Sequence, residues 1–289
     1  MWIADGWKDY EVLDASAGEK LERWGSYLLI RPDPQVIWQT KKGPQWKKVN
    51  AHYHRSSRGG GSWEFFDLPD EWAIRYRDLT FHLKPFSFKH TGLFPEQAAN
   101  WDWFSSLIKE RISQGEKVRV LNLFAYTGGA TVAAAKAGAS VTHVDASKGM
   151  TLWAKENAAS SGLSEAPVRY LVDDCAKLVA REIRRGNTYD AIIMDPPSYG
   201  RGPKGEIWKI EESIFPFLIE AEKLLSDHPL FFLVNSYTTG LQPAVLSYML
   251  RTVLTPRFAG VKVEAGEIGL PVSGNGLVLP CGAAGRAQF

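Results

Sequence analysis

The sequence predicts an α/β protein, in which helices cover both faces of a doubly wound, mostly parallel sheet, with a small β-rich domain at the N-terminus. Strand-like and helix-like segments alternate from about residue 85 onward. The runs Ile192–Met194 and Phe231–Val234 are apolar at every position, as strands covered on both faces require. The first 84 residues follow a different rhythm of short apolar stretches. We therefore expect two domains, residues 1–84 and 85–289.

The N-terminal region holds apolar stretches that turn residues interrupt, which is typical of short strands. Pro32, Pro34 and Gly59–Gly61 are among these turn residues. Strands are expected at residues 26–30, 35–38, 63–66 and 79–83. The region thus predicts a small β-rich domain.

The second region predicts βαβ units. Pro95 suits the first position of a helix that runs to about Ser113 with one apolar face. Strands are then expected at 118–123, 139–145, 167–172, 189–195 and 230–236, and helices at about 129–137, 147–161, 174–185, 206–226 and 241–253. Pro216 lies within the helix expected over 206–226, so we expect a kink or a break there. Residues 261–268 and 277–287 predict a terminal hairpin.

Composition is that of an ordinary globular protein. The chain has 289 residues, of which 45% are hydrophobic and 23% charged, and its net charge is only +2. Its two cysteines, Cys175 and Cys281, suggest neither a disulfide framework nor a zinc site, and no metal is expected. The N-terminus lacks a signal-peptide pattern, and no run has the length of a membrane span. We expect a cytoplasmic protein that does not contact membranes.

The loop after the strand at 118–123 carries the first candidate site, because ligands bind at the carboxyl ends of parallel strands. Gly128 and Gly129 allow a tight turn and a close approach to a ligand, and amides at the next helix start can face a carboxylate. A dinucleotide fingerprint would place glycines at 124, 126 and 129. Phe124 and Tyr126 occupy two of these positions, which argues against NAD or FAD. A purely structural turn remains an alternative.

Acidic residues follow the next two expected strands. Asp145 is placed to accept hydrogen bonds from ribose hydroxyls, although it could instead cap the helix near Ser147. Ser147 can cap that helix itself, which favours the ribose role. Asp174 can accept from an exocyclic amine such as that of adenine, or cap a helix, and both alternatives stay open.

Asp195-Pro196-Pro197-Ser198-Tyr199 follows the strand expected at 189–195. The two prolines stiffen the backbone and supply no N–H donors, so their carbonyls are left to accept. A carboxylate beside free carbonyls can hold an amino group, and an aromatic ring such as that of Tyr199 can stack on a base. A simple turn is the alternative. The loop from Arg201 to Lys204 is basic and suits an anionic substrate, and a solvated loop is the alternative.

Basic residues concentrate in the stretch 41–58, with no acid between Asp33 and Glu64. Aromatic residues and histidines are interleaved with them: Trp46, His52, Tyr53 and His54. Cations neutralise phosphates and rings stack on unpaired bases, so RNA contact is one interpretation and a solvated face is the other. The candidate RNA-binding cations are Lys41, Lys42, Lys47, Lys48, Arg55 and Arg58.

Together these motifs resemble a class I S-adenosylmethionine-dependent methyltransferase over roughly residues 85–289. The motifs that carry the resemblance are Asn122–Gly129, Asp145, Asp174 and Asp195–Ser198. Lys89–Gln97 also resembles the segment that precedes the core in bacterial 23S rRNA methyltransferases of the cytosine-C5 and guanine-N7 types. Residues 1–84 stand where those enzymes carry an RNA-binding module, which this region does not clearly match.

The resemblance implies a Rossmann-like fold with a seven-stranded sheet and S-adenosyl-L-methionine as cofactor. Gly128 and nearby amides would hold the methionine end, Asp145 the ribose, and Asp174 with the Cys175 amide the adenine, while Gln97 would cover the cofactor. The expected cofactor-binding residues are Gln97, Asn122, Phe124, Ala125, Tyr126, Thr127, Gly128, Asp145, Ala146, Ser147, Asp174 and Cys175. The expected catalytic residues are Asp195, Pro196, Pro197, Ser198 and Tyr199.

One departure from the resemblance concerns the reaction. Cytosine-C5 enzymes need a cysteine nucleophile, and neither Cys175 nor Cys281 stands where this family would place it. We therefore expect methyl transfer to a base nitrogen of RNA, with rRNA as the substrate. The alternatives are a nicotinamide-dependent oxidoreductase, a methyltransferase acting on a protein or small molecule, and a non-catalytic RNA-binding protein. Oligomeric state is not indicated.

Overall fold

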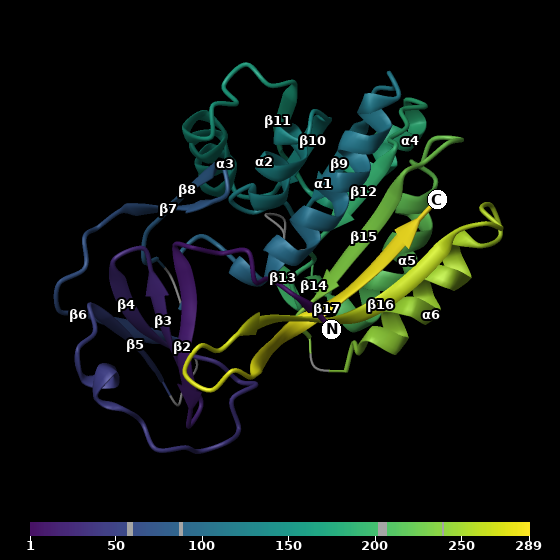
Figure 1. Cartoon of the computed structure of the whole chain (residues 1–289). Helices are drawn as coiled ribbons and strands as arrows, with labels where there is room; N and C mark the ends of the chain where they lie inside the picture. The colour runs from purple at the N-terminus through teal and green to yellow at the C-terminus, as the bar shows by residue number, and fades with distance from the viewer. Residues whose placement is uncertain (57–59, 87–88, 202–206, 239) are drawn as a thin grey trace. The chain divides into compact units, whose positions relative to one another are not determined.

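The computed structural model describes residues 1–56, 60–86, 89–201, 207–238 and 240–289. The chain forms two compact units (Figure 1). The first unit holds Met1, 100–267 and 282–289, and the second holds 2–99 and 268–281.

This division differs from the predicted boundary at 84/85, because two further segments pack with the N-terminal strands. The Arg31 guanidinium donates to the Lys89 carbonyl at 2.9 Å. From the C-terminal side, the Ser273 amide donates to the Val12 carbonyl at 2.9 Å. Residues 85–99 and 268–281 therefore belong to the small unit.

The first unit is built on seven strands of an eight-stranded sheet, in the order β16-β17-β15-β12-β9-β10-β11; the eighth strand, β1 (Trp2–Ile3), pairs with β16 and belongs to the second unit. These strands are β9 (Arg119–Leu123), β10 (Ser140–Asp145), β11 (Val168–Val172), β12 (Ala191–Met194), β15 (Phe231–Ser236), β16 (Lys262–Pro271) and β17 (Val278–Gln288). The parallel strands of this sheet are β9, β10, β11, β12 and β15, and β17 is antiparallel to β15. This is the predicted doubly wound, Rossmann-like sheet.

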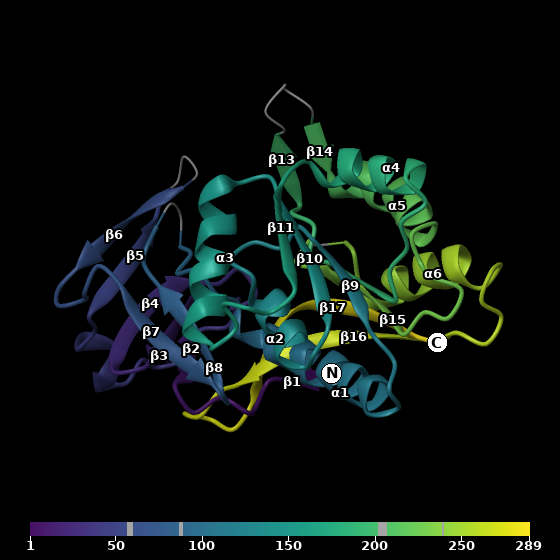
Figure 2. The same ribbon diagram turned by 90° about the horizontal axis from the view of Figure 1, so that it is seen from above.

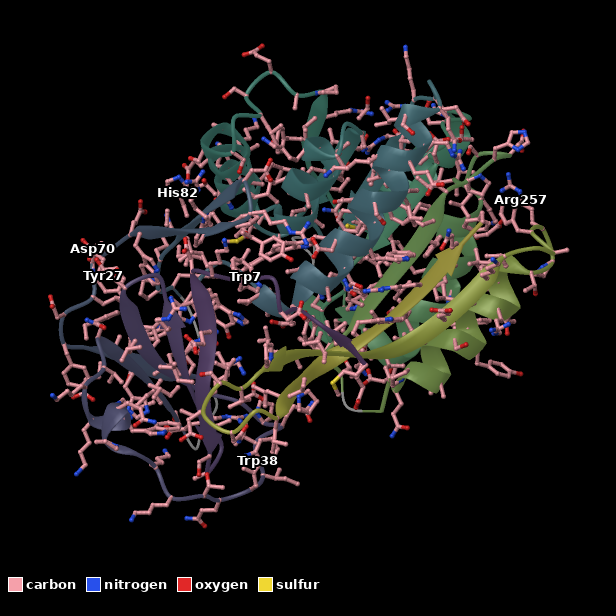
Figure 3. All side chains as sticks on the ribbon, in the orientation of Figure 1. Trp7, Tyr27, Trp38, Asp70, His82 and Arg257 are labelled. Atoms are coloured by element: carbon pink, nitrogen blue, oxygen red, sulfur yellow. The ribbon has the colours of Figure 1, made fainter. Side chains whose placement is uncertain are left out.

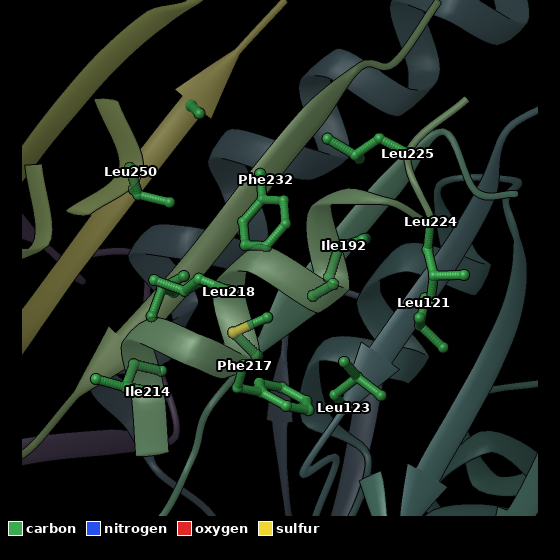
Figure 4. Close-up of a cluster of buried hydrophobic side chains, with 14 of the residues drawn as sticks. Leu121, Leu123, Ile192, Ile214, Phe217, Leu218, Leu224, Leu225, Phe232 and Leu250 are labelled. Atoms are coloured by element: carbon green, nitrogen blue, oxygen red, sulfur yellow. The ribbon is translucent and has the colours of Figure 1, made fainter. Parts of the chain in front are cut away.

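Helices cover both faces of this sheet (Figure 2). On one face lie α1 (Ala98–Ser113), α2 (Gly129–Lys136) and α3 (Lys148–Ser160), and on the other lie α4 (Cys175–Arg184), α5 (Ile210–Glu222) and α6 (Pro243–Leu254). Alternate strand residues serve the two faces. Ile192 and Phe232 point into the core beneath α5 and α6 (Figure 4), whereas Phe231 stacks on Phe104 of α1.

The predicted strands and helices of this unit match the observed ones within a few residues, with one error. The helix expected over 206–226 begins only at Ile210, because β14 (Ile207–Lys209) pairs with β13 (Tyr199–Arg201) as an antiparallel hairpin. The helix α5 then runs through Pro216 as a single element rather than as two. The apolar run is therefore helical as predicted, but its first residues belong to a strand.

The second unit contains a five-stranded sheet in the order β2-β3-β4-β5-β6 and a separate hairpin of β7 and β8. Their bounds are β2 (Tyr10–Ser16), β3 (Glu19–Trp24), β4 (Tyr27–Pro32), β5 (Ala51–Arg55), β6 (Gly61–Phe65), β7 (Trp72–Tyr76) and β8 (Leu79–Leu83). Two short 3-10 helices, η1 (Pro44–Lys47) and η2 (Pro95–Gln97), and the strand β1 (Trp2–Ile3) complete it. β1 pairs in parallel with Ile268–Gly269 of β16.

The strand predicted at 35–38 is wrong. Asp33 forms a turn there, since its carboxylate accepts from the Gln35 amide at 3.0 Å and its carbonyl accepts from the Val36 amide at 3.2 Å. Such side-chain turns compete with strand pairing. Elsewhere in the unit, Trp7 donates its indole N–H to the Pro95 carbonyl at 2.9 Å (Figure 3).

Charge pairing inside the second unit explains why β3 carries a buried acid. Glu22 is fully buried and accepts from Arg31 at 2.6 and 2.8 Å and from Tyr10 at 2.7 Å. Burial alone would raise the pKa of Glu22, but Arg31 and Lys20 outweigh it and lower that pKa to about 2. The acid is therefore charged and satisfied at neutral pH.

Candidate functional site

The loop between β9 and α2 turns in a conformation that ordinary side chains rarely adopt. Phe124 and Tyr126 have φ values of 55° and 52°, and Gly128 has a φ of 82°. A Cβ atom on Gly128 would lie 2.7 Å from the Ala154 Cβ, so only glycine fits there. Strained backbone of this kind concentrates at ligand-binding sites.

The start of α2 offers backbone donors at this loop. Gly128 is the N-cap, and no side chain caps the helix. Gly129 lies so close to α1 that a Cβ there would meet the Trp101 ring at 2.8 Å. The first amides of a helix are not engaged within it, so an anionic group can be bound there.

Asp145, at the end of β10, ties two loops together. Its Oδ2 accepts from the Tyr126 amide at 2.8 Å, and its Oδ1 accepts from the Ser147 amide at 2.8 Å. Burial raises the pKa of Asp145, and the two amide donors oppose that shift. Ser147 caps α3 by accepting from the Met150 amide, so Asp145 is not the cap. Each carboxylate oxygen keeps a second lone pair for a further donor.

The acids after β11 are engaged in the protein. Asp174 caps α4 by accepting from the Lys177 amide at 2.9 Å, so the helix-cap interpretation holds for one of its oxygens. Asp173 forms an ion pair with Arg181. The Cys175 thiol lies against the first loop and accepts from the Phe124 amide at 3.3 Å. The loops after β9, β10 and β11 thus meet along one edge.

A buried polar chain supports the first loop from behind. The Asn122 amide donates to the Thr131 hydroxyl at 2.9 Å, and that hydroxyl contacts His143 Nδ1 at 2.9 Å. Burial lowers the pKa of His143 to about 3, so this imidazole is neutral at neutral pH. The Thr127 carbonyl accepts from Asn157 at 2.8 Å. Asn122 and Thr127 therefore position the loop; their contact with a cofactor remains a prediction.

The corner after β12 is only partly as expected. Asp195 is half-buried and Pro196 buried, whereas Pro197, Ser198 and Tyr199 are exposed. The Pro197 carbonyl is not free, since it accepts from the Trp208 indole at 2.7 Å. A role of the Pro196 carbonyl in holding an amine stays a prediction.

Ser198 joins this corner to the segment after β15, because its hydroxyl lies 2.5 Å from the Thr238 hydroxyl. Trp208 and Thr238 are not among the predicted site residues. Trp208 falls within the helix expected over 206–226, and Thr238 contacts Ser198 only across 40 positions of sequence. Sequence spacing carries no signal for either.

The predicted RNA-binding cations differ in their surroundings. Lys42 pairs with Glu19 at 2.5 Å and lies over the Trp46 ring at 4.1 Å. Trp46 is buried and donates to Asp14 at 2.7 Å, so its ring is not open for base stacking. Lys41, Lys47, Lys48 and Arg55 are exposed.

The remaining predicted residues lie elsewhere. Tyr53 is also buried. Arg55 lines a cavity of about 520 Å³ within the second unit, together with Glu19, Asp33 and His54. Arg58 and Lys204 fall outside the described residues. Gln97 belongs to the second unit, and its place over the cofactor stays a prediction.

Metal-binding clusters and membrane-spanning helices are both absent from the part of the chain that the structure describes. Over the described ranges, no group of His, Cys, Asp or Glu side chains could hold a metal ion. No helix in the same part of the chain is long and apolar enough to cross a membrane.

The sequence of this chain is similar to those of known methyltransferases. A family model described as S-adenosylmethionine-dependent methyltransferase matches residues 34–209. The ribosomal RNA large subunit methyltransferase K/L of Pseudoalteromonas atlantica is 35% identical over 196 residues, which cover 67% of this chain and 25% of that protein. Its counterpart from Magnetococcus marinus is 32% identical over 245 residues, covering 82% and 31%. The chain thus spans about a quarter to a third of these relatives.

A solved structure extends the likeness over nearly the whole chain. The SAM-dependent methyltransferase from Agrobacterium tumefaciens superposes with a TM-score of 0.92 at 34% identity. The match covers 99% of this chain and 92% of that one. Both units of the fold are therefore present in a protein of similar length.

Proposed function

Because the chain belongs to the family of S-adenosylmethionine-dependent methyltransferases, whose cofactor is S-adenosylmethionine, we propose that it methylates a base nitrogen of ribosomal RNA. The relatives named as rRNA large subunit methyltransferases support this substrate class. Family membership decides against the nicotinamide-dependent oxidoreductase. The observation that carries the proposal is the corner after β12, where Asp195 and Pro196 directly follow the last strand residue, Met194.

The residues at the strand ends fit the cofactor. The uncapped amides of α2 suit the methionine carboxylate, and the close approach at Gly128 brings backbone near the ligand. The spare lone pairs of Asp145 suit the ribose hydroxyls. The second oxygen of Asp174 and the Cys175 amide suit the adenine. S-adenosylmethionine, when bound, supplies an electrophilic methyl group on a positively charged sulfur.

Asp195 and Pro196 orient the amine that accepts the methyl group. Their oxygens accept the two N–H groups, so the nitrogen lone pair is directed toward the methyl carbon. With the cofactor bound, that lone pair would form the N–C bond while the C–S electron pair stays with sulfur, and Asp195 or solvent would take the proton from the product nitrogen. Good orientation lowers a barrier by about 7–11 kcal/mol.

Other residues serve the nucleic acid. Tyr199 is 51% exposed, so its ring is available to stack on a base. A base within a helix must first be flipped out, at a cost of a few kcal/mol. Exposed Lys41, Lys47 and Lys48 suit phosphate contacts. The basic loop from Arg201 to Lys204 is proposed to contact the anionic substrate as well.

Nitrogen is the favoured acceptor because neither cysteine suits nucleophilic attack on a ring carbon. Burial raises the pKa of the Cys175 thiol far above its ordinary value, which keeps it protonated. Burial has the same effect on the pKa of Cys281. C5 methylation needs a thiolate at the target.

The test is mass spectrometry of rRNA nucleosides from cells with and without the gene. We expect one methylated nucleoside to disappear from large-subunit rRNA when the gene is deleted, and to return with the intact gene. An unchanged nucleoside profile would overturn rRNA as the substrate and leave a protein or small-molecule acceptor.

A further inference from the structure

A buried chain of three polar side chains ends beside the proposed target corner. Arg286 of β17 donates through Nε and Nη2 to Asn100 Oδ1, at 2.9 and 2.7 Å. Asn100 Nδ2 in turn donates to Asn235 Oδ1 at 3.0 Å. Asn100 and Asn235 are 0% and 2% exposed. Such a network is costly unless its donors and acceptors are matched, so it fixes side-chain orientation.

The polarity of this chain is set at its arginine end. A guanidinium has donors and no acceptor, so the Asn100 atom that faces Arg286 must be the carbonyl oxygen. The other arm of Asn100 is then the amino group, and it requires an acceptor from Asn235. Asn235 is left with its own amino group, Nδ2, turned away from Asn100.

The Nδ2 group of Asn235 lies at the strand end where the target is proposed to bind. Met194 and Val234 are register partners in β12 and β15, so the residues that follow them, Asp195 and Asn235, are neighbours. The Asn235 Nδ2 makes no hydrogen bond within the described part of the chain, and it is not one of the fully enclosed polar atoms. Asn235 and Asp195 thus bring a side-chain donor and a side-chain acceptor to adjacent strand ends.

We propose that Asn235 reads the target base, with its Nδ2 group donating to a ring acceptor of the nucleotide whose amine is held by Asp195. Asn100 and Arg286 are positioning residues that keep the Asn235 amide in this orientation. This assignment rests on the proposed function of the Asp195 corner. Asp195 and Asn235 together form one acceptor and one donor at adjacent strand ends.

This pairing selects a class of target. It matches an exocyclic amine beside a ring nitrogen acceptor, an edge that adenine, cytosine and guanine possess and uracil lacks. It does not match an attack on a ring nitrogen that has no amine beside it, because Asp195 would then face no donor. The expected product is an N-methylated exocyclic amine.

Asn100→Asp inverts the polarity without removing volume. The carboxylate still accepts from Arg286, but it offers only acceptors to Asn235, whose amide must turn and present its carbonyl oxygen to the target. Arg286→Lys is the conservative control, because a lysine head also has only donors and leaves the Asn235 orientation unchanged.

The experiment measures methyl transfer from labelled S-adenosylmethionine to an unmodified large-subunit rRNA transcript, with thermal unfolding and calorimetric cofactor binding in parallel. We expect Asn235→Ala and Asn100→Asp to lose about 10–100-fold in kcat/KM, as for an unpaired group in a desolvated site, with cofactor affinity unchanged. Arg286→Lys should retain more activity than Asn100→Asp. A merely structural role would instead lower thermal stability and cofactor affinity together.

A modified transcript gives the sharpest discrimination. When the ring nitrogen beside the target amine is replaced by C–H, wild type should lose a similar factor, and Asn235→Ala should lose nothing further. The assignment of Asn235 would be wrong if Asn235→Ala lost further activity on the modified transcript. It would also be wrong if Asn235→Ala were as active as wild type on the unmodified transcript. Either result would leave the proposed function intact. A wild-type protein that methylates no rRNA transcript overturns the proposed function, and this inference with it.

Discussion

Asp145 Oδ2 accepts a hydrogen bond from the backbone amide of Tyr126 at 2.8 Å, across 19 positions of sequence. The contact holds the carboxyl ends of two neighbouring strands together. It also stabilises the left-handed conformation of Tyr126, whose φ is 52°. One carboxylate therefore shapes the loop and, as we propose, binds the cofactor ribose.

Asp145→Asn should weaken S-adenosylmethionine binding by about 10–100-fold. The amide replaces one acceptor oxygen by a donor, and hydrogen bonds to a charged group contribute about 1.5–3 kcal/mol. Isothermal calorimetry measures this affinity. Asp190→Asn is the matched control, because Asp190 accepts from the Arg119 amide where β9 begins, at the opposite end from the proposed site. Equal affinity of Asp145→Asn and wild type would contradict the ribose assignment.

Gly128→Ala should destabilise the protein more than Gly162→Ala. Both glycines have positive φ, at 82° and 73°, so both substitutions strain the backbone by about 1–2 kcal/mol. Only at Gly128 does the new Cβ clash, at 2.7 Å from Ala154; Gly162 has nothing within 4 Å. Denaturant unfolding gives the two free-energy changes. If the two substitutions change the free energy of unfolding equally, the close contact between Gly128 and Ala154 does not affect stability.

Glu22 should make stability depend on pH in the acid range. Its pKa is lowered from 4.5 to about 2, so its stabilisation is complete above pH 4.5 and is lost as pH falls toward 2. The shift corresponds to about 3 kcal/mol. We expect Glu22→Gln to be less stable than wild type at pH 6, with the gap narrowing between pH 4.5 and 2. If the difference in free energy of unfolding between the two proteins stays constant from pH 4.5 to pH 2, Glu22 is not ionised in the folded protein.

Lys47→Ala and Lys48→Ala should weaken RNA binding and reduce its salt dependence. Removing one lysine–phosphate interaction lowers the slope of log K against log salt by about 0.7–0.9. Fluorescence titration of an rRNA fragment at several salt concentrations measures the slope. Lys223→Ala serves as the control, since Lys223 pairs with Glu220 on α5. An unchanged slope in both variants would show that Lys47 and Lys48 do not contact RNA phosphates.

Much of the first unit could be predicted because its central strands carry apolar runs. Ile192 and Phe232 belong to runs that only a doubly covered sheet accommodates, and the polar residues that follow such strands mark a ligand edge. Asp145 could be found in this way. Its hydrogen bond to Tyr126 could not, since the strain at Tyr126 is a property of the folded loop.

The rest depends on contacts between distant residues. The strand β3 could not be predicted from its sequence, because an acid such as Glu22 is expected at an exposed position. Only the folded structure shows that Arg31 pairs with Glu22 in the interior. Asn100 and Asn235 are 135 positions apart, and no local pattern brings them together. Trp208 belongs to a short hairpin that Pro197 helps to hold through one hydrogen bond. Such partners become visible only with the tertiary structure.

The central claim is that Asp195 holds the amine that receives the methyl group. The most direct measurement compares wild type and Asp195→Ala for methyl transfer to an unmodified large-subunit rRNA transcript and for S-adenosylmethionine affinity. We predict a loss in turnover of at least about 100-fold with cofactor affinity within a few-fold of wild type, because only the target loses its partner. An equal loss in cofactor affinity, or unimpaired turnover, would contradict the assignment.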